Sequence, residues 1–308
     1  MIILHSTFRS LSTTTLSTTL NRMEDVNVWS TGLTKSQVID LFEKMSAETN
    51  LRSLNIGANT LISVPANTLG TALSKLTDIR VDTTYLRPMQ TDSFFNQLTK
   101  KTLLKRLDMN NNNLSEVNEE VFSMNINKVQ EVDLSQTKLT KEQLKELFKK
   151  MIEKTNLRML KINDVDLSSV PANILAEALN LVQEIEISKC SLTIYQGIYL
   201  FSKMAEKTKI EKLKIDNNDL SLVPVEYLPK GANKVSEIDL GGTKLTDIQM
   251  TALFIEMLEE TKIQKIVLDG NVETGYKDFV NSLRDRVNVI VTFDRSHTTT
   301  TIHLFKKF

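Results

Sequence analysis

The chain has few of the residues that reactive sites commonly use. It contains one cysteine and three histidines among 308 residues. Cys190 cannot form a disulfide within the chain, which favours a reducing compartment, and we expect a cytoplasmic protein. His5, His297 and His303 lie near the termini, which does not favour a catalytic pair with Cys190. We therefore expect a structural thiol.

Short motifs that hold cofactors are also missing. The sequence has no metal-ligand cluster, Walker loop or paired-glycine dinucleotide motif. The stretch GGTKL from Gly241 recurs as SQTKL from Ser135 without glycine, which indicates a turn after a strand. We predict a protein that is not an enzyme and that uses no cofactor, metal or small-molecule substrate.

Neither sign of charge is in excess, since 38 basic residues balance 38 acidic ones. No bulk charge therefore indicates a nucleic-acid or membrane partner. No apolar run reaches the roughly 18 residues of a membrane span. The composition, 41% hydrophobic and 25% charged, is typical of a soluble globular protein.

What the chain does contain is a helical segment that recurs every 53 residues. Leu144, Leu147, Phe148 and Met151 show its apolar stripe, with the i, i+3, i+4, i+7 spacing of a helix that buries one face. In four of the five copies a Thr precedes a Gln by three residues, as in a capping box. The copies read LTKSQVIDLFEKM from Leu33, LRPMQTDSFFNQL from Leu86, LTKEQLKELFKKM from Leu139, LTIYQGIYLFSKM from Leu192 and LTDIQMTALFIEM from Leu245.

A second pattern lies between these segments and predicts short strands. Apolar residues such as Leu54 and Ile56 alternate with polar ones, which is the period of a strand. Spacings of 28 and 25 residues alternate between the copies. The ten copies begin at Met23, Leu51, Leu76, Leu104, Val129, Leu157, Val182, Ile210, Val235 and Ile263.

These two patterns together resemble leucine-rich repeats. The alternation of two unit lengths with a helix in each resembles the ribonuclease-inhibitor-like class, which includes NLR-type sensors and Ran GTPase activators. The resemblance covers almost the entire chain and implies an α/β solenoid, a horseshoe with a parallel β-sheet on its concave face and helices on its convex face. We expect this domain over residues 1–293, with partial repeats at both ends, a degenerate last strand from Val287 to Phe293, and a flexible tail at residues 294–308.

The first 22 residues allow two interpretations. They are rich in Ser and Thr, contain Arg and lack acids, as a mitochondrial transit signal does. However, Met1 and Ile3 continue the strand positions, and Phe8, Leu11 and Leu16 continue the core positions of a repeat. We favour the remnant of a repeat in a fragment of a longer array.

The chain must turn at the ninth residue of each copy, and the side chain there is expected to bond to the loop backbone. Cys190 occupies this position in its copy. The polar residues that occupy it elsewhere are Asn59, Thr84, Asn112, Thr137, Asn218, Thr243 and Asn271.

The resemblance also implies that the polar strand positions form an exposed face. The third, fifth and seventh residues of the ten copies include 12 acidic and six basic side chains. One interpretation is a ladder of ion pairs, each worth about 0–1 kcal/mol, that keeps the sheet soluble; the other is a ligand-binding surface. The excess of acids disfavours nucleic acid and favours a protein partner with a basic patch.

Several residues depart from this ladder and are candidate contacts, because Trp, Tyr and Arg are favoured interface anchors. For Trp29 the alternative is an end residue that packs on the neighbouring strand. The candidate partner-binding residues are Trp29, Arg80, Tyr85, Lys105, Arg106, Met159 and Lys161.

The sequence thus predicts a non-catalytic protein–protein interaction module that binds its partner on the concave face. Proteins that it resembles serve as sensors, as inhibitor scaffolds or as substrate receptors of ubiquitin ligases. Ran GTPase activators, which it also resembles, position the catalytic machinery of their partner, so a GTPase-activating scaffold is an alternative. A structural array without a specific ligand is a third.

Overall fold

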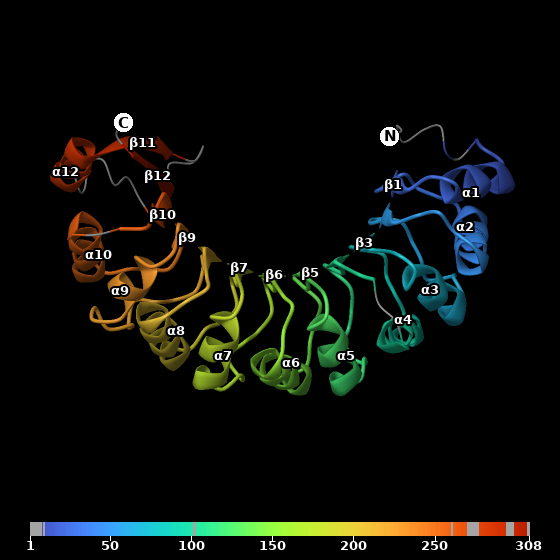
Figure 1. Cartoon of the computed structure of the whole chain (residues 1–308), viewed down its shortest axis with the longest axis horizontal. Coiled ribbons are helices and arrows are strands. Elements are labelled where there is room, and N and C mark those ends of the chain that lie inside the picture. Colours follow the sequence, from blue (N-terminus) through green and yellow to red (C-terminus); the bar gives the residue numbers. More distant parts are fainter. Residues whose placement is uncertain are drawn as a thin grey trace. The chain divides into compact units, whose positions relative to one another are not determined.

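The computed structural model describes residues 8, 10–100, 103–259, 261–269, 277–293 and 299–306. The chain divides into two compact units, residues 1–157 and 158–308. In each unit, short strands line the inner side and helices line the outer side (Figure 1). The predicted α/β leucine-rich-repeat solenoid is confirmed, whereas the domain boundary at residue 293 stays a prediction.

Unit 1 has a parallel sheet of five strands in sequence order among its described residues. The strands pair in register, so that Leu54, Ile79, Leu107 and Val132 lie side by side, each no more than 2% exposed. The elements are α1 (Thr13–Asn21), β1 (Asp25–Asn27), α2 (Lys35–Ala47), β2 (Ser53–Asn55), α3 (Ala66–Leu73), β3 (Asp78–Arg80), α4 (Pro88–Lys100), β4 (Arg106–Asp108), α5 (Glu119–Ile126), β5 (Glu131–Asp133) and α6 (Lys141–Glu153).

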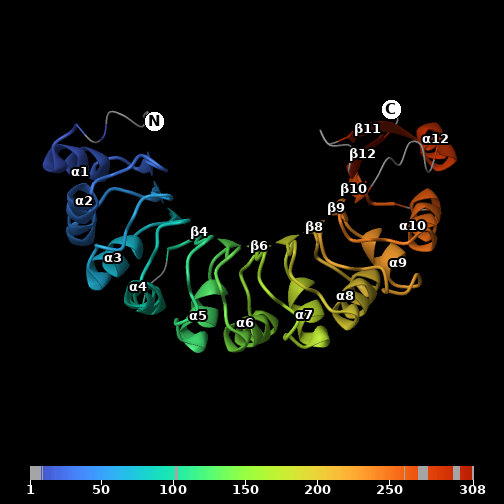
Figure 2. The same ribbon diagram turned by 180° about the vertical axis from the view of Figure 1, so that it is seen from behind.

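Unit 2 repeats this arrangement and then departs from it at its C-terminal end (Figure 2). Its strands follow the order β6-β7-β8-β9-β10-β12-β11. The elements are β6 (Met159–Lys161), α7 (Ala172–Leu179), β7 (Glu184–Glu186), α8 (Ile194–Glu206), β8 (Lys212–Lys214), α9 (Leu228–Ala232), β9 (Glu237–Asp239), α10 (Asp247–Glu259), β10 (Lys265–Asp269), α12 (Lys277–Arg286), β11 (Val287–Phe293) and β12 (Thr299–Lys306).

The predicted helical stripes form the core between strands and helices. Leu144, Leu147 and Met151 of α6 are each no more than 1% exposed. One phenylalanine per 53-residue step is buried in the same place of each long helix, which fills the layer between the sheet and the helices. These residues are Phe42, Phe95, Phe148, Phe201 and Phe254.

The glutamine of each capping box has a second role that the sequence analysis missed. In α6, Thr140 and Gln143 form the predicted box, with Gln143 Oε1 accepting from Thr140 N at 2.8 Å. Gln143 Nε2 also donates to the carbonyls of Leu114 and Val117 in the preceding coil, at 2.8 and 2.6 Å. The same pair of bonds recurs at Gln37, Gln90, Gln196 and Gln249.

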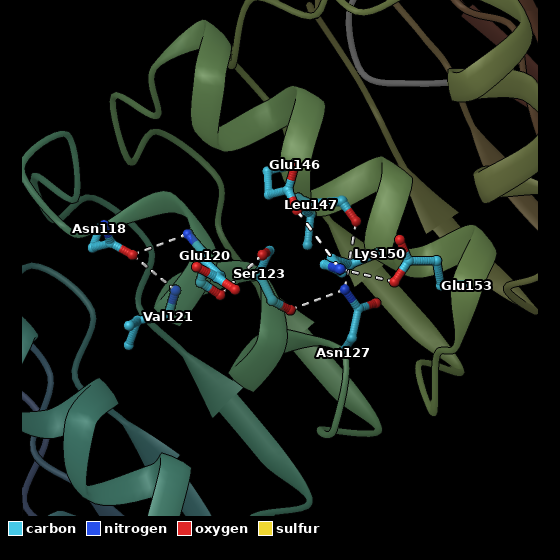
Figure 3. A network of polar contacts seen from close by, with 9 residues as sticks. All are labelled: Asn118, Glu120, Val121, Ser123, Asn127, Glu146, Leu147, Lys150 and Glu153. Atoms are coloured by element: carbon cyan, nitrogen blue, oxygen red, sulfur yellow. Dashed lines mark hydrogen bonds and ion pairs between the residues drawn. The ribbon is translucent and has the colours of Figure 1, made fainter.

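The short helix α5 begins differently. Asn118 accepts from the backbone N–H groups of Glu120 and Val121, both at 3.1 Å (Figure 3). At its other end, Asn127 Nδ2 donates to the carbonyls of Ser123 and of Leu147 in α6. Side-chain amides thus cap the short helix and join it to the next long one.

The expectation of a flexible tail is wrong for Thr299–Lys306. These residues form β12, which pairs antiparallel with β10 on one side and with β11 on the other. Alternate side chains, Thr300, Ile302 and Leu304, are buried, so the segment has the period of a strand and covers an otherwise open sheet edge. Residues 287–293 form the expected strand, but not as a parallel neighbour of β10.

At the other end, α1 precedes β1, and the partial repeat expected there stays a prediction. Phe8 and Leu16 are buried as expected, whereas Leu11 is 43% exposed, so its assignment to a core position is wrong. Leu11 precedes α1 and lies in a turn, where its backbone N–H donates to the carbonyl of Phe8. Met1, Ile3 and the turn residue Asn271 lie outside the described residues.

Candidate partner-binding surface

The outward-pointing residues of the short strands form the inner face of each unit. The middle residue of each strand points into the core, and its two neighbours point outward. We define the unit 1 inner face as the third, fifth and seventh residues of the first five copies. Its six acids and two bases are Asp25, Asp78, Asp82, Asp108, Glu131, Asp133, Arg80 and Arg106.

The two bases of the unit 1 inner face differ in their contacts. Arg106 pairs with Glu131 on the next strand, Nε to Oε2 at 2.6 Å, and approaches Asp78 on the previous strand at 3.8 Å. Arg80 is exposed and forms no ion pair with any described residue. The acids of this face are therefore only partly neutralised.

Trp29 reaches across one intervening strand, β2, to an acid that follows β3. Its Nε1 donates to Asp82 Oδ2 at 3.1 Å, and the indole passes over Gly57, which stands between them. A Cβ atom at Gly57 would lie 2.7 Å from Trp29 Cδ1. Trp29 thus packs on its neighbours, as the alternative interpretation expects, while 53% of its surface stays exposed.

Beside Trp29 lies a hollow of about 420 Å³ that Arg80, Asp82 and Asp108 also line. Burial raises the pKa of Asp108 to about 6. The Asn110 N–H and the charge of Arg80 oppose this rise, and the charges of Asp133 and Asp82 add to it. Asp108 therefore carries most of its charge only above about pH 6.

The inner face of unit 2 is a ladder of ion pairs, as one interpretation of the sequence predicts. Lys161 Nζ lies 2.9 Å from Glu186, and Lys212 lies 3.7 Å from Glu184 and 3.6 Å from Glu237. Burial acts to raise the pKa of Glu186, but hydrogen bonds from Lys161 and Asn163 and the charges of Lys161 and Lys214 lower it below its ordinary value. Its charge is thus satisfied within the sheet.

The predicted contact residues do not form one cluster. Trp29 and Arg80 line the same hollow, and Arg106 lines the adjoining one with Arg80. Tyr85 is 65% exposed in a turn after β3, whereas Lys105 is exposed just before β4, so the two lie at opposite edges of the parallel sheet.

Met159 and Lys161 belong to unit 2, where Met159 lines a hollow on the ion-pair ladder. The binding role of all seven residues stays a prediction.

Sequence reasoning missed the acids of the hollow as individual contacts. In the sequence, Asp82 and Asp108 are only two of the 12 acids that form the charge excess. The glycine at position 57, between Trp29 and Asp82 in one column of the sheet, is the signal that could have indicated their contact.

The structural role of Cys190 is confirmed. Its Sγ donates to the carbonyl of Ile162 at 3.2 Å, in the column where Asn59, Asn112 and Asn218 also bond to loop carbonyls. Burial raises the pKa of the thiol to about 12, which disfavours the nucleophilic thiolate at neutral pH.

Two kinds of site are absent from the described part of the chain. No three His, Cys, Asp or Glu side chains are grouped so that they could hold a metal ion. Among the helices of the described residues, none combines the length and the apolar character of a membrane span.

A protein-family model described as Leucine Rich Repeat matches residues 103–124, which include β4 and the start of α5. No curated protein matches the chain. The match and the repetition of strand and helix through both units support a leucine-rich repeat protein. Repeats of this family generally act as non-enzymatic modules for protein–protein interaction.

Proposed function

We propose that this protein is a non-catalytic interaction module that binds a basic patch of a partner protein on the unit 1 inner face. The observation that carries the proposal is the incomplete neutralisation of that face. Of its two bases, Arg106 is engaged by two of the six acids, and Arg80 is left beside Asp82, Asp108 and the exposed indole of Trp29.

This arrangement suits a partner that brings its own cations. Arginine or lysine side chains of the partner would neutralise Asp82 and Asp108, and Trp29 offers an aromatic surface of the kind that anchors interfaces. In unit 2 three acids of the inner face, Glu184, Glu186 and Glu237, already pair with Lys161 or Lys212, and that face carries four lysines, so less electrostatic attraction is available there.

We further propose the ribonuclease-inhibitor-like class, because units of 28 and 25 residues alternate and each carries a helix. A cytoplasmic location is proposed on the single, buried, unpaired cysteine, which a reducing compartment would preserve.

The test is affinity capture from a source lysate with three forms of the full chain. The first is unchanged, the second carries Asp82→Asn and Asp108→Asn, and the third carries Lys141→Ala and Glu142→Ala on the exposed start of α6. Because Asn keeps the size and the acceptor oxygen of Asp, the second form removes charge with little change of shape.

We expect partner recovery to fall about tenfold for the second form, to stay unchanged for the third, and to weaken as salt concentration rises. Circular dichroism verifies that all three are folded. Equal recovery by the first and second forms would show that the acids of this face do not bind the partner.

A further inference from the structure

A further hollow, of about 930 Å³, lies away from the inner faces, at the edge of unit 2 where strands β7 to β10 begin. We call it the edge groove and define it by Lys209, Lys234, Lys262, Glu211, Leu304 and Phe305. All of these residues belong to unit 2.

The floor of the edge groove is a continuous run of backbone hydrogen bonds. Glu211 N donates to the carbonyl of Gln183, Ser236 N to that of Glu211, Gln264 N to that of Ser236, and Leu304 N to that of Gln264, all at 2.7–2.8 Å. Since these donors and acceptors are satisfied, a ligand would be held mainly by the side chains around it.

Strand β12 supplies an apolar wall to the edge groove. Phe305 is 48% exposed there, next to the buried Leu304. This exposed ring belongs to the segment that departs from the repeat pattern, so the groove exists only because β12 joins the sheet at this end.

Three lysines stand on the rim, at the same position of three successive coils. Lys209, Lys234 and Lys262 are exposed, and their side chains form no ion pair or hydrogen bond with the described residues. One acid, Glu211, lines the groove with them. The groove therefore combines an excess of positive charge with an apolar wall.

Other coils do not share this feature. The three lysines each directly precede the first residue of a copy. In the six copies that start between Leu51 and Val182, the residue at this place is neutral or is a lysine with a partner. Lys75 Nζ donates to three carbonyls at the end of α2, and Lys128 Nζ to a side chain of α5. The neutral residues are Asn50, Leu103, Asn156 and Leu181.

We propose that the edge groove binds an extended acidic and apolar segment of a partner protein. Carboxylates of the segment pair with Lys209, Lys234 and Lys262, and an apolar side chain packs on Phe305. Adjacent strands lie about 4.8 Å apart, so the three lysines span roughly 10 Å, the length of about three extended residues. Alternate residues of an extended segment lie roughly 6.6 Å apart. Long lysine side chains can cover this difference, so acids at alternate positions reach the three lysines.

The experiment measures binding of a fluorescein-labelled peptide of alternating Glu and Phe to the full chain by fluorescence anisotropy. The groove variant carries Lys209→Glu, Lys234→Glu and Lys262→Glu. The matched control carries Lys141→Glu, Lys149→Glu and Lys154→Glu at exposed positions of unit 1, with the same change of net charge.

We expect the groove variant to lose about tenfold or more in affinity and the control to lose little, because a local pairing is removed only in the first. Phe305→Ala weakens binding less strongly. A peptide with Ser in place of Phe binds more weakly than the original, and one with Lys in place of Glu does not bind.

Three outcomes would overturn the proposal: no measurable binding, equal loss in both triple variants, or a single-stranded DNA oligonucleotide that binds at the groove more tightly than the peptide. The Asp82→Asn and Asp108→Asn form should bind the peptide like the unchanged chain. Failure of the inner-face proposal and failure of the groove proposal are therefore distinguishable.

Discussion

At the scale of single residues, the buried glutamines show how one side chain can join two coils. Each Gln accepts the N–H of its own helix cap and donates to two carbonyls of the coil before it. Gln143 is 1% exposed, so water cannot replace these bonds. A buried amide with all its bonds made stabilises a fold, whereas an apolar replacement leaves backbone groups without partners.

We predict that Gln143→Leu lowers the free energy of unfolding by about 2–4 kcal/mol, because the carbonyls of Leu114 and Val117 and the N–H of Thr140 each lose a hydrogen bond. Thr140→Ala, which removes only the cap acceptor, should cost about 1 kcal/mol. Urea unfolding followed by circular dichroism compares them. If the two substitutions cost the same, the bonds to the preceding coil contribute little.

A second residue-scale prediction uses the only tryptophan of the chain as a reporter. Gly57→Ala would push a methyl group against Trp29 and Asp82. We expect the indole to leave Asp82 and its fluorescence emission to shift, with little loss of stability. Gly241→Ala is the control, because its new methyl group would meet no indole; an unchanged emission spectrum in Gly57→Ala would contradict the contact.

The raised pKa of Asp108 makes the free energy of unfolding depend on pH. Its pKa of about 6 lies above the ordinary 3.8, so the folded state holds this proton more tightly than the unfolded state. The stability that this provides is complete below about pH 4 and is lost as pH rises through 6.

Asp108→Asn should therefore raise the free energy of unfolding by about 1–2 kcal/mol at pH 7.5, after allowance for solvent access, and by almost nothing at pH 4. Urea unfolding at the two pH values measures the difference. Glu142→Gln, at an exposed position of α6, provides the control. A gain that is the same at both pH values would contradict the raised pKa.

At the scale of elements, the long helices share a capping box at their N-termini, and the box is incomplete in α4. In α4, Arg87 N donates to Gln90 Oε1 at 2.8 Å, but no threonine hydroxyl accepts from Gln90 N. Pro88 at the first position of α4 partly compensates, because it needs no partner for a missing N–H. Half of the capping box is thus present.

We predict that Arg87→Thr completes the box and raises the free energy of unfolding by about 0.5–1 kcal/mol. Arg87→Ala removes the same charge without adding an acceptor and should bring no gain. Thermal and urea unfolding distinguish the two variants. A gain of equal size in both would assign the effect to the lost arginine rather than to the cap.

At the scale of the whole molecule, the last strand of a stack of repeats has an open edge unless another element covers it. In unit 2, β12 and β11 pair antiparallel beside β10 and so cover the edge that the last repeat would leave open. The cap is not itself a repeat, and its buried residues, Thr300, Ile302 and Leu304, do not follow the leucine pattern. A chain of stacked coils is stabilised by such a closing element.

We predict that a chain ending at residue 293 exchanges the backbone amides of β9 and β10 about tenfold faster or more, because β10 loses its partner strand. Amides of β1 to β5 in unit 1 should exchange as before, since each coil contacts mainly its neighbours. Hydrogen–deuterium exchange measures both sets. Unchanged exchange in β10 would show that pairing with β12 does not protect the edge of β10.

Most of the fold could be predicted from the sequence because each coil packs on adjacent coils through residues at regular spacing. Leu54, Ile79 and Leu107 lie in register as their period requires. The exceptions are residues without a repeated context. β12 matches no copy of the pattern, and Leu11 occupies a core position that its turn does not bury.

The candidate site was less predictable, because its properties depend on which side chains reach one another. Sequence columns identified Trp29 and Arg80 as exposed, but not that Trp29 reaches Asp82 over Gly57. They also placed Arg106 and Lys161 among the contacts, although both are held in ion pairs.

By itself, then, the sequence determined a leucine-rich solenoid with alternating units, buried stripes and helix caps, because these depend on short-range spacing along the chain. Only the tertiary structure decided which charges are neutralised, where hollows form and how unit 2 ends. Those features depend on distances between side chains of different coils and on a terminal strand that pairs out of sequence order, and neither is encoded in a repeat period.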